Sequence, residues 1–282
     1  PGFTGLLRPV CRDFTSPGAY LGHPTITVAG DLIAHRLGSA YGPDNSETAL
    51  RRSLSGPLEG LETDVCLTAD GELVLLHNPL LSLGTTLSGW AHERTLEELL
   101  EGSLVGPDCE PADEPPLTLE QLLHQTPLDL IVQVEVKTQS NPELARRTAA
   151  AICRRYACSP QRQRLEVISF HTSACEVAAA AGFRTRLVIW ADYAPEVLAG
   201  WALRHGVSGV KVEHFLLSNE LVGRLRAAGI TVSTGTVNDV ELLEKVLHAE
   251  PRCITTDRPH ELRDDAIARG LLPVSYGLPA AA

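Results

Sequence analysis

The sequence predicts an α/β protein folded as a (β/α)8 TIM barrel, with a small insertion after the second strand. The chain has 282 residues, a length that suits one large α/β barrel or two ordinary domains. Along it, eight short apolar runs rich in β-branched residues alternate with eight amphipathic stretches, which favours the barrel. No Gly-x-Gly-x-x-Gly loop follows the first run, so a doubly wound nucleotide-binding sheet is the weaker alternative.

The predicted strands are short runs of Val, Ile, Leu and Thr bounded by turn-forming residues. In chain order they cover residues 31–35, 61–67, 128–136, 165–170, 184–190, 207–212, 230–234 and 252–255. A helical stretch separates consecutive strands, and that alternation is typical of a parallel sheet built from βα units.

The predicted helices carry apolar residues at helical spacing. They cover residues 46–54, 117–124, 142–156, 172–181, 195–204, 218–228, 239–248 and 259–269. The helix at 142–156 has the clearest start. Asn141 can cap it, Pro142 suits the first turn, and Glu143 complements the helix dipole.

Three segments fall outside this alternation. Residues 1–30 contain several Pro and Gly with little periodicity and are interpreted as an N-terminal arm. The barrel is expected over residues 31–270. Within it, residues 78–116 are rich in Gly, Pro and acidic residues, and we expect them to lie over the barrel mouth as an insertion. Residues 271–282 form the expected C-terminal tail.

Composition excludes several classes of protein. The chain has 24 Lys and Arg against 35 Asp and Glu, a net charge of −11, which argues against nucleic acid as a partner. No apolar run is long enough for a transmembrane segment. The seven cysteines are scattered, without the paired short spacings of a zinc site, and we expect them to be buried, reduced thiols.

These features favour a cytoplasmic protein. The chain opens on Pro1 and shows no basic leader followed by an apolar run, so no signal peptide is expected. Because the initiator Met is missing, trimming of a targeting segment, and with it secretion, stays open.

Charged residues recur on one face of several predicted strands. Glu62 and Asp64 are two residues apart and therefore project from the same side of their strand, and Glu135 and Lys137 do the same on the next. The pattern appears a third time around Lys211. At the carboxyl ends of barrel strands such residues line the mouth, where barrel enzymes keep their active sites. The alternative is an internal salt-bridge layer in which the lysines neutralise the acids.

Two histidines end apolar runs. His35 ends the first predicted strand and is followed by Arg36, a residue type that binds phosphate with two hydrogen bonds. His77 follows the apolar run 73–76. A lone histidine beside an apolar run is more often structural. Together with an arginine and three carboxylates, however, two histidines suit phosphodiester cleavage, with one deprotonating the attacking oxygen and the other protonating the leaving one.

At these residues the sequence resembles the glycerophosphodiester phosphodiesterase (GDPD) family. The matching motifs run in family order over residues 32–260. They are Ala34-His35-Arg36-Leu37-Gly38, Pro43-Asp44-Asn45-Ser46, Glu62-Thr63-Asp64-Val65, Thr68-Ala69-Asp70-Gly71, His77, Glu135-Val136-Lys137, Thr236-Val237-Asn238 and Thr256-Asp257-Arg258-Pro259.

The resemblance implies a barrel enzyme that uses one divalent cation, Mg²⁺ or Ca²⁺, to hydrolyse glycerophosphodiesters to glycerol 3-phosphate and an alcohol. It implies that the glycerol 2-hydroxyl attacks phosphorus and that water then opens a cyclic phosphate. The implied roles are acid/base catalysis by His35 and His77, phosphate binding by Arg36 and Lys137, and metal binding by Glu62, Asp64 and Glu135. Which histidine is the acid, which metal binds, and which alcohol leaves stay open.

The chain departs from the family pattern at four places. The family's His-Arg-Gly has Leu37 here, with Gly38 one place later. Asp44 replaces a glutamate, Asn78 replaces an aspartate after the histidine, and Gly235 stands where a tryptophan often precedes Thr-Val-Asn. None of these touches the implied acid/base pair or metal ligands, so they bear on substrate choice.

Two rival functions are weighed against this one. A phospholipase D of the spider-venom type shares the barrel, the histidine pair and the metal site, and would want an apolar rim for peripheral lipid contact. Four leucines of the insertion are candidates for that rim: Leu80, Leu81, Leu83 and Leu87. A non-catalytic barrel usually loses an acid, a base or a ligand, whereas all five implied positions are kept. Trp190 and Phe215, near strand ends, either wall the substrate pocket or pack in the core; the oligomeric state stays undetermined.

Overall fold

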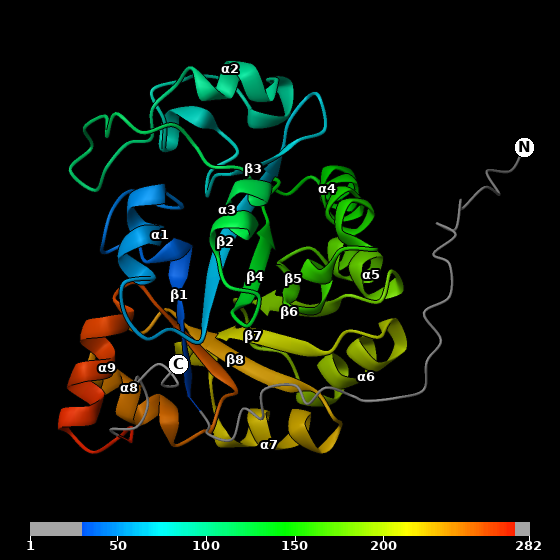
Figure 1. Cartoon of the computed structure of the whole chain (residues 1–282). Coiled ribbons are helices and arrows are strands. Elements are labelled where there is room, and N and C mark those ends of the chain that lie inside the picture. The colour runs from blue at the N-terminus through cyan, green and yellow to red at the C-terminus, as the bar shows by residue number, and fades with distance from the viewer. Residues whose placement is uncertain (1–29, 274–282) are drawn as a thin grey trace, which may run out of the picture.

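Eight parallel strands close into a barrel in the computed structural model, which describes residues 30–273 (Figure 1). The strands are β1 (Asp31–Ala34), β2 (Gly60–Leu67), β4 (Ile131–Val136), β5 (Leu165–Ser169), β6 (Arg184–Ile189), β7 (Gly209–Glu213), β8 (Thr231–Gly235) and β9 (Cys253–Thr256). β1 pairs with both β9 and β2, and this double pairing closes the sheet. The predicted (β/α)8 barrel is therefore confirmed.

A ninth strand, β3 (Leu73–Leu75), stands outside the parallel set. It pairs antiparallel with the last residues of β2, where Val65 lies opposite Leu75. β1 pairs only with the start of β2, at Gly60 and Leu61, so β3 occupies the edge that β1 leaves free. The β2–β3 hairpin thus extends beyond the barrel and then returns the chain to the mouth.

Eight helices cover the barrel, in the predicted order. They are α1 (Glu47–Ser53), α3 (Leu119–Gln125), α4 (Pro142–Tyr156), α5 (Thr172–Ala180), α6 (Pro195–His205), α7 (Asn219–Ala227), α8 (Val240–Leu247) and α9 (Pro259–Ala268). Several begin at a side-chain cap, such as Ser46 on the backbone N–H of Ala49 and Asn141 on that of Leu144. The predicted strand at 128–136 starts late, at Ile131, because Pro127 and Leu130 close a turn.

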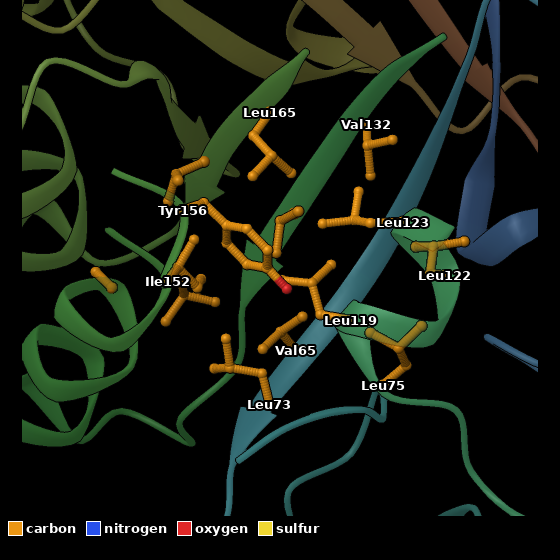
Figure 2. Packing of buried hydrophobic residues seen from close by; sticks show 14 of the residues in the cluster. Val65, Leu73, Leu75, Leu119, Leu122, Leu123, Val132, Ile152, Tyr156 and Leu165 are labelled. Atoms are coloured by element: carbon orange, nitrogen blue, oxygen red, sulfur yellow. The ribbon is translucent and has the colours of Figure 1, made fainter. Parts of the chain in front are cut away.

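The apolar core lies between the strands and the helices. Outward residues of β2, β3 and β4 pack against α3 and α4, and Figure 2 shows Val65 between Tyr156 and Leu119, with Val132 near Leu123. The strand residues between them point into the barrel, and many of these are polar.

The amino end of the barrel is closed by a buried ion pair. Arg186 Nε lies 2.9 Å from Glu166 Oε2, which also accepts a 2.8 Å hydrogen bond from Gln133 Nε2. The Glu166 carboxylate is thus paired with a cation and an amide donor away from water, as a buried charge requires. This interior salt bridge involves neither of the lysines considered in the alternative for the strand charges, and it lies at the opposite end from the histidines.

The segment between β3 and α3 forms a small layer of its own. It contains the short 3-10 helices η2 (Leu81–Leu83) and η3 (Ala91–Glu93) and the helix α2 (Leu96–Leu100), and Figure 1 shows it above β3. An apolar cluster that includes Leu81, Leu99 and Leu104 anchors it to β2 and β3. Of the four leucines considered for a lipid-binding rim, Leu81 is fully buried and Leu83 is exposed.

Cys11 lies outside the described residues, and the other six cysteines follow the prediction only where they lie on strands and helices. Cys66, Cys153, Cys175 and Cys253 are buried free thiols. The expectation is wrong for two others, both in loops. Cys109 is an exposed free thiol, and Cys158 is disulfide-bonded. Scattered sequence spacing does not reveal which thiols pair.

The N-terminal arm and the C-terminal tail are predicted at the two ends of the chain. The predicted arm, except its last residue, and most of the predicted tail lie outside the described residues. The domain boundaries therefore stay predictions, as does the cytoplasmic localisation. Among the helices described, none combines the length and the apolar character needed to cross a bilayer.

Candidate active site

The structure brings all seven predicted site residues to one place, the carboxyl ends of β1, β2 and β4 and the end of the β2–β3 hairpin. Parallel pairing sets Asp64 of β2 directly beside Glu135 of β4. His35 follows β1, and His77 comes two residues after β3. The backbone N–H of Leu76 donates to the carbonyl of Asp64, which fixes the return of the hairpin beside the carboxylates. Arg36 and Lys137 complete the group.

Glu62, Asp64 and Glu135 form a buried acidic cluster. One carboxylate oxygen from each lies within 4.8 Å of the others, and the exposed fractions are 0%, 1% and 6%. Burial and the neighbouring Asp64 and Glu62 charges together raise the pKa of Glu135 above its usual range, despite the opposing effect of Lys137. Glu62 Oε1 is buried and has no hydrogen-bond partner among the described residues. Crowded carboxylates with an unused oxygen fit a hard divalent cation.

Lys137 offsets part of this charge. Its Nζ lies 2.5 Å from Glu135 Oε1 and 3.2 Å from Asp64 Oδ1. Burial alone would lower the lysine pKa, but the nearby carboxylates outweigh it and raise the pKa. The ammonium group therefore stays charged at the mouth, where an anionic substrate group would meet it.

Asn45 holds Asp64 in place. Its side-chain amide donates to Asp64 Oδ2 at 2.9 Å, and its carbonyl oxygen accepts from the hydroxyl of Thr63 at 2.7 Å and the backbone N–H of Asp64 at 3.1 Å. Asn45 adopts a φ of 60°, in the left-handed region that asparagine tolerates better than most residues. Its contacts fix the direction in which the carboxylate points.

Arg36 connects the acidic cluster to the second histidine. Its backbone N–H donates to Glu62 Oε2 at 3.0 Å, and its guanidinium donates to Asp44 Oδ2 at 2.6 Å and to His77 Nε2 at 2.8 Å. Arg36 has a φ of 49° and Leu37 a φ of 65°, so both occupy the left-handed region. Such conformations cost on the order of 1–3 kcal/mol each and are kept where function needs them.

His77 is held as a neutral base. An arginine can only donate hydrogen bonds, so the 2.8 Å contact makes His77 Nε2 the acceptor, through the lone pair that this nitrogen has when the ring is neutral. Burial, together with the positive charges of Lys137 and Arg36, lowers the His77 pKa, while Asp64 opposes the change. The ring is therefore unprotonated near neutral pH.

His35 is oriented by Asp257. Its Nδ1 lies 2.7 Å from Asp257 Oδ1, which leaves Nε2 on the side of Glu62, at 3.9 Å. Burial would raise the Asp257 pKa, but hydrogen bonds from His35, Ser39 and Asn238 outweigh it and lower the pKa. A charged Asp257 accepts the Nδ1 proton and so fixes which nitrogen of His35 faces the site.

Sequence reasoning assigned no role to four positioning residues. Asn45, Asp257 and Asn238 all lie in motifs that carried the family resemblance, and that was the available signal. Ser39, which donates to Asp257 at 2.7 Å, lies in none of them.

A cavity of about 360 Å³ opens beside His77. Barrel loops supply Ser39 and Asp44, and the segment between β3 and α3 supplies Asn78, Leu83 and further residues of its wall. This segment therefore shapes one side of the site, which leaves space beside a catalytic candidate for part of a substrate.

Comparison with known proteins points to one family. The model of the glycerophosphoryl diester phosphodiesterase family matches residues 35–261. A glycerophosphodiester phosphodiesterase of Caldanaerobacter subterraneus subsp. tengcongensis is 28% identical over 238 residues, which span 82% of this chain and 95% of that relative.

Solved structures share the fold. A glycerophosphodiester phosphodiesterase of Parabacteroides distasonis superposes with a TM-score of 0.71 at 24% identity, over 86% of this chain and 99% of that one. A phosphodiesterase of Oleispira antarctica, solved with the product sn-glycerol-3-phosphate, has a TM-score of 0.73 at 22% identity, over 85% of this chain and 97% of that one.

Proposed function

This chain belongs to the glycerophosphoryl diester phosphodiesterase family, and we propose that it cleaves glycerophosphodiesters to glycerol 3-phosphate and an alcohol through a cyclic phosphate. The observation that carries the proposal is the convergence of two histidines, two cations and three buried carboxylates at the barrel mouth. The named product of the Oleispira antarctica phosphodiesterase supports glycerol 3-phosphate as the retained half.

One divalent cation, Mg²⁺ or Ca²⁺, fits Glu62, Asp64 and Glu135, whose oxygens lie within 4.8 Å of one another. A bound cation would neutralise the crowded carboxylates and polarise a phosphoryl oxygen. Arg36 and Lys137 flank the cluster and bind the remaining phosphoryl oxygens. Arg36 is especially suited, because its planar guanidinium makes paired hydrogen bonds to phosphate.

His77 serves as the base and His35 as the acid. When the guanidinium of Arg36 turns to the phosphate, the lone pair of His77 Nε2 is free to accept the proton of the glycerol 2-hydroxyl. That oxygen then attacks phosphorus and the bond from phosphorus to the leaving oxygen breaks. His35, protonated at Nε2 and held by Asp257, gives its proton to the departing alcohol.

The second half of the reaction reverses these roles. His35 Nε2 is now neutral and takes a proton from water, which attacks the cyclic phosphate. Protonated His77 returns its proton to the glycerol 2-oxygen as that bond breaks. The ring opens to glycerol 3-phosphate, and both histidines regain their starting states. Intramolecular attack gives the first step a large effective-concentration advantage over attack by water.

A substrate panel tests the proposal. We expect release of glycerol 3-phosphate from several glycerophosphodiesters, stopped by excess chelator and restored by Mg²⁺ or Ca²⁺. A 2-deoxy analogue should not react, because it lacks the attacking hydroxyl. Absence of glycerol 3-phosphate in every case contradicts the activity, and comparable turnover of the 2-deoxy analogue contradicts the cyclic intermediate.

A further inference from the structure

A small polar cavity lies inside the amino end of the barrel, at the far end from the histidines. Its volume is about 10 Å³, the space that a single water-sized particle needs. Residues at or near the starts of β1, β4, β5, β6 and β9 line it. Those that carry charge are Asp31, Glu166, Arg184, Arg186 and Arg252. Three arginines against two carboxylates leave one positive charge in excess, in a chain whose net charge is −11.

Strand alternation turns the two β6 arginines toward this cavity. Leu187 of β6 packs outward in the apolar core, so Arg184 and Arg186 lie on the inner face of the strand. Gly209 is the partner of Arg186 in the neighbouring strand β7. A Cβ on Gly209 would lie 2.5 Å from Arg186 Nη1, which is closer than the two atoms can pack. The absence of a side chain at this glycine therefore makes room for the guanidinium group.

The carboxylates do not use all the donors of Arg186. Glu166 is paired with Arg186 Nε and accepts a hydrogen bond from Gln133. Arg186 Nη1 donates to Thr231 Oγ1 at 2.9 Å. Its Nη2 makes no hydrogen bond with any residue from 30 to 273. One edge of the guanidinium group is therefore left for a further acceptor.

The other two arginines have no carboxylate partner within the described part of the chain. Arg184 Nη2 donates to the carbonyl oxygen of Gln163 at 2.7 Å, and the half-buried side chain of Arg252 makes no hydrogen bond or ion pair there. Burial lowers the pKa of Arg184, and Arg186 and Arg252 lower this pKa further against the opposing effect of Glu166. Positive charge is thus crowded around the cavity, and a negative ion is favoured inside it.

We propose that a chloride ion binds in this cavity, held by the guanidinium groups of Arg184, Arg186 and Arg252. Hydrogen bonds from a charged donor to an anion are about twice as strong as those between neutral groups. The volume favours a single-atom anion, because phosphate and sulfate carry four oxygens around their central atom. A bound chloride balances the excess charge where the barrel strands begin, and it thereby stabilises the folded protein.

Thermal unfolding in two sodium salts tests the site. Gluconate is an anion too large for the cavity, so it supplies the same ionic strength without binding there. We expect wild-type Tm to be about 2–4 °C higher in chloride than in gluconate at equal concentration. Arg184→Gln and Arg252→Gln should each lose most of this difference. Arg146→Gln, at an exposed position of α4, makes the same change of side chain elsewhere and should keep it.

Chlorine NMR measures binding directly, because chloride that exchanges with a site on a large protein gives a broader line. The wild-type protein should broaden the line, and Arg252→Gln should weaken binding by about tenfold, the effect of losing a hydrogen bond from a charged donor. Arg36→Gln removes an arginine at the barrel mouth instead and should leave the broadening unchanged. Circular dichroism checks that each variant is folded. Neither measurement needs a substrate, so the result does not depend on the proposed function.

Several results would overturn the inference. One is a wild-type protein that does not broaden the chlorine line. Another is an equal Tm difference in the wild type, Arg184→Gln and Arg252→Gln, which would mean that chloride acts on the surface as a whole. Loss of broadening in Arg36→Gln alone would place the ion at the barrel mouth. If sulfate raises Tm in the wild type but not in the Arg184 and Arg252 variants, the cavity accepts an oxyanion instead of chloride.

Discussion

Two asparagines hold two aspartates in the same way on opposite sides of the site. Asn45 accepts from the Thr63 hydroxyl and the Asp64 backbone N–H, and donates to the Asp64 carboxylate. Asn238 makes the same three hydrogen bonds with the hydroxyl of Thr256 and with the backbone and side chain of Asp257.

The neighbours of each aspartate differ. Burial opposes charge on Asp64, but the charges of Lys137, of His77 when it is protonated and of Arg36, together with the amide of Asn45, outweigh burial and lower the Asp64 pKa. Asp257 is bonded instead by a histidine, a hydroxyl and an amide, with no lysine or arginine among the groups that lower its pKa. The same three hydrogen bonds of an asparagine side chain therefore hold one carboxylate toward cations and the other toward a catalytic histidine. The geometry is set by the asparagine, and the chemistry is set by what lies opposite.

The largest expected effect is on the cation side. Asp64→Asn should lower kcat by on the order of 10⁴-fold, because the variant loses a ligand and a charge that a divalent cation requires. Calorimetric titration with Mg²⁺ and Ca²⁺ should show weakened binding in the same variant. Wild-type turnover in Asp64→Asn, or in excess chelator, contradicts the metal site.

Loss of either histidine should have the next largest effect on kcat. His35→Ala and His77→Ala should each lose about 10²–10⁴-fold in kcat, the usual share of acid/base catalysis. A nitrophenol leaving group needs no proton, so it should partly rescue His35→Ala but not His77→Ala. Rates on alkyl and nitrophenyl esters measure this. Rescue of His77→Ala alone would exchange the assigned roles, and equal losses on every substrate would refute the two-histidine mechanism.

Asp257→Asn should cost about 10²-fold in kcat, because His35 loses the acceptor that fixes its Nδ1 proton. Its losses on alkyl and nitrophenyl esters should follow those of His35→Ala. The Asp257 pKa is lowered from 3.8, so its charge stabilises the fold above about pH 4 and that contribution shrinks as pH falls. The variant should therefore lower Tm more at pH 7 than at pH 3; an equal loss at both would contradict the charged state.

Replacing each asparagine tests whether the Asp64 side and the Asp257 side of the site act separately. Asn45→Ala and Asn238→Ala should each reduce kcat/KM by about tenfold, as expected for residues that position others. Asn45→Ala should also weaken the affinity for the cation, whereas Asn238→Ala should leave it unchanged. Metal titrations on both variants decide the point, and equal losses of affinity would mean that the two sides are not separate.

The smallest effect is a shift in pH dependence. Burial and two cations lower the His77 pKa from 6.5, so the neutral base persists at pH values where an ordinary histidine is protonated. The acid limb of kcat/KM should therefore lie below pH 6.5. Arg36→Gln removes one of those cations, and the limb should move to higher pH, whatever the loss in phosphate binding. If the acid limb of kcat/KM lies at the same pH in Arg36→Gln as in the wild type, Arg36 does not lower the His77 pKa.

The barrel and the acidic cluster could be predicted because they follow from periodicity. Residues two apart on a strand share a face, and that alone places Glu62 beside Asp64, and Glu135 beside Lys137. Asn45 and Asp257 lack such a pattern. Their roles depend on a left-handed turn at Asn45 and on a contact across more than 200 residues of chain, between His35 and Asp257, so apart from the family motifs the sequence carries no local sign of them.

The β2–β3 hairpin positions His77, whereas the segment that follows it forms the wall of the adjoining cavity. His77 is delivered by a strand outside the closed barrel, and the wall of the adjoining cavity begins directly after it. Lengthening, shortening or exchanging the stretch between Asn78 and Leu117 would therefore remodel the cavity while Leu73–Leu75 stay paired and the histidine keeps its place. Grafting this stretch between relatives is therefore a route to new substrate ranges on the same barrel, on condition that the graft keeps the apolar packing of Leu81 and Leu99 against β3.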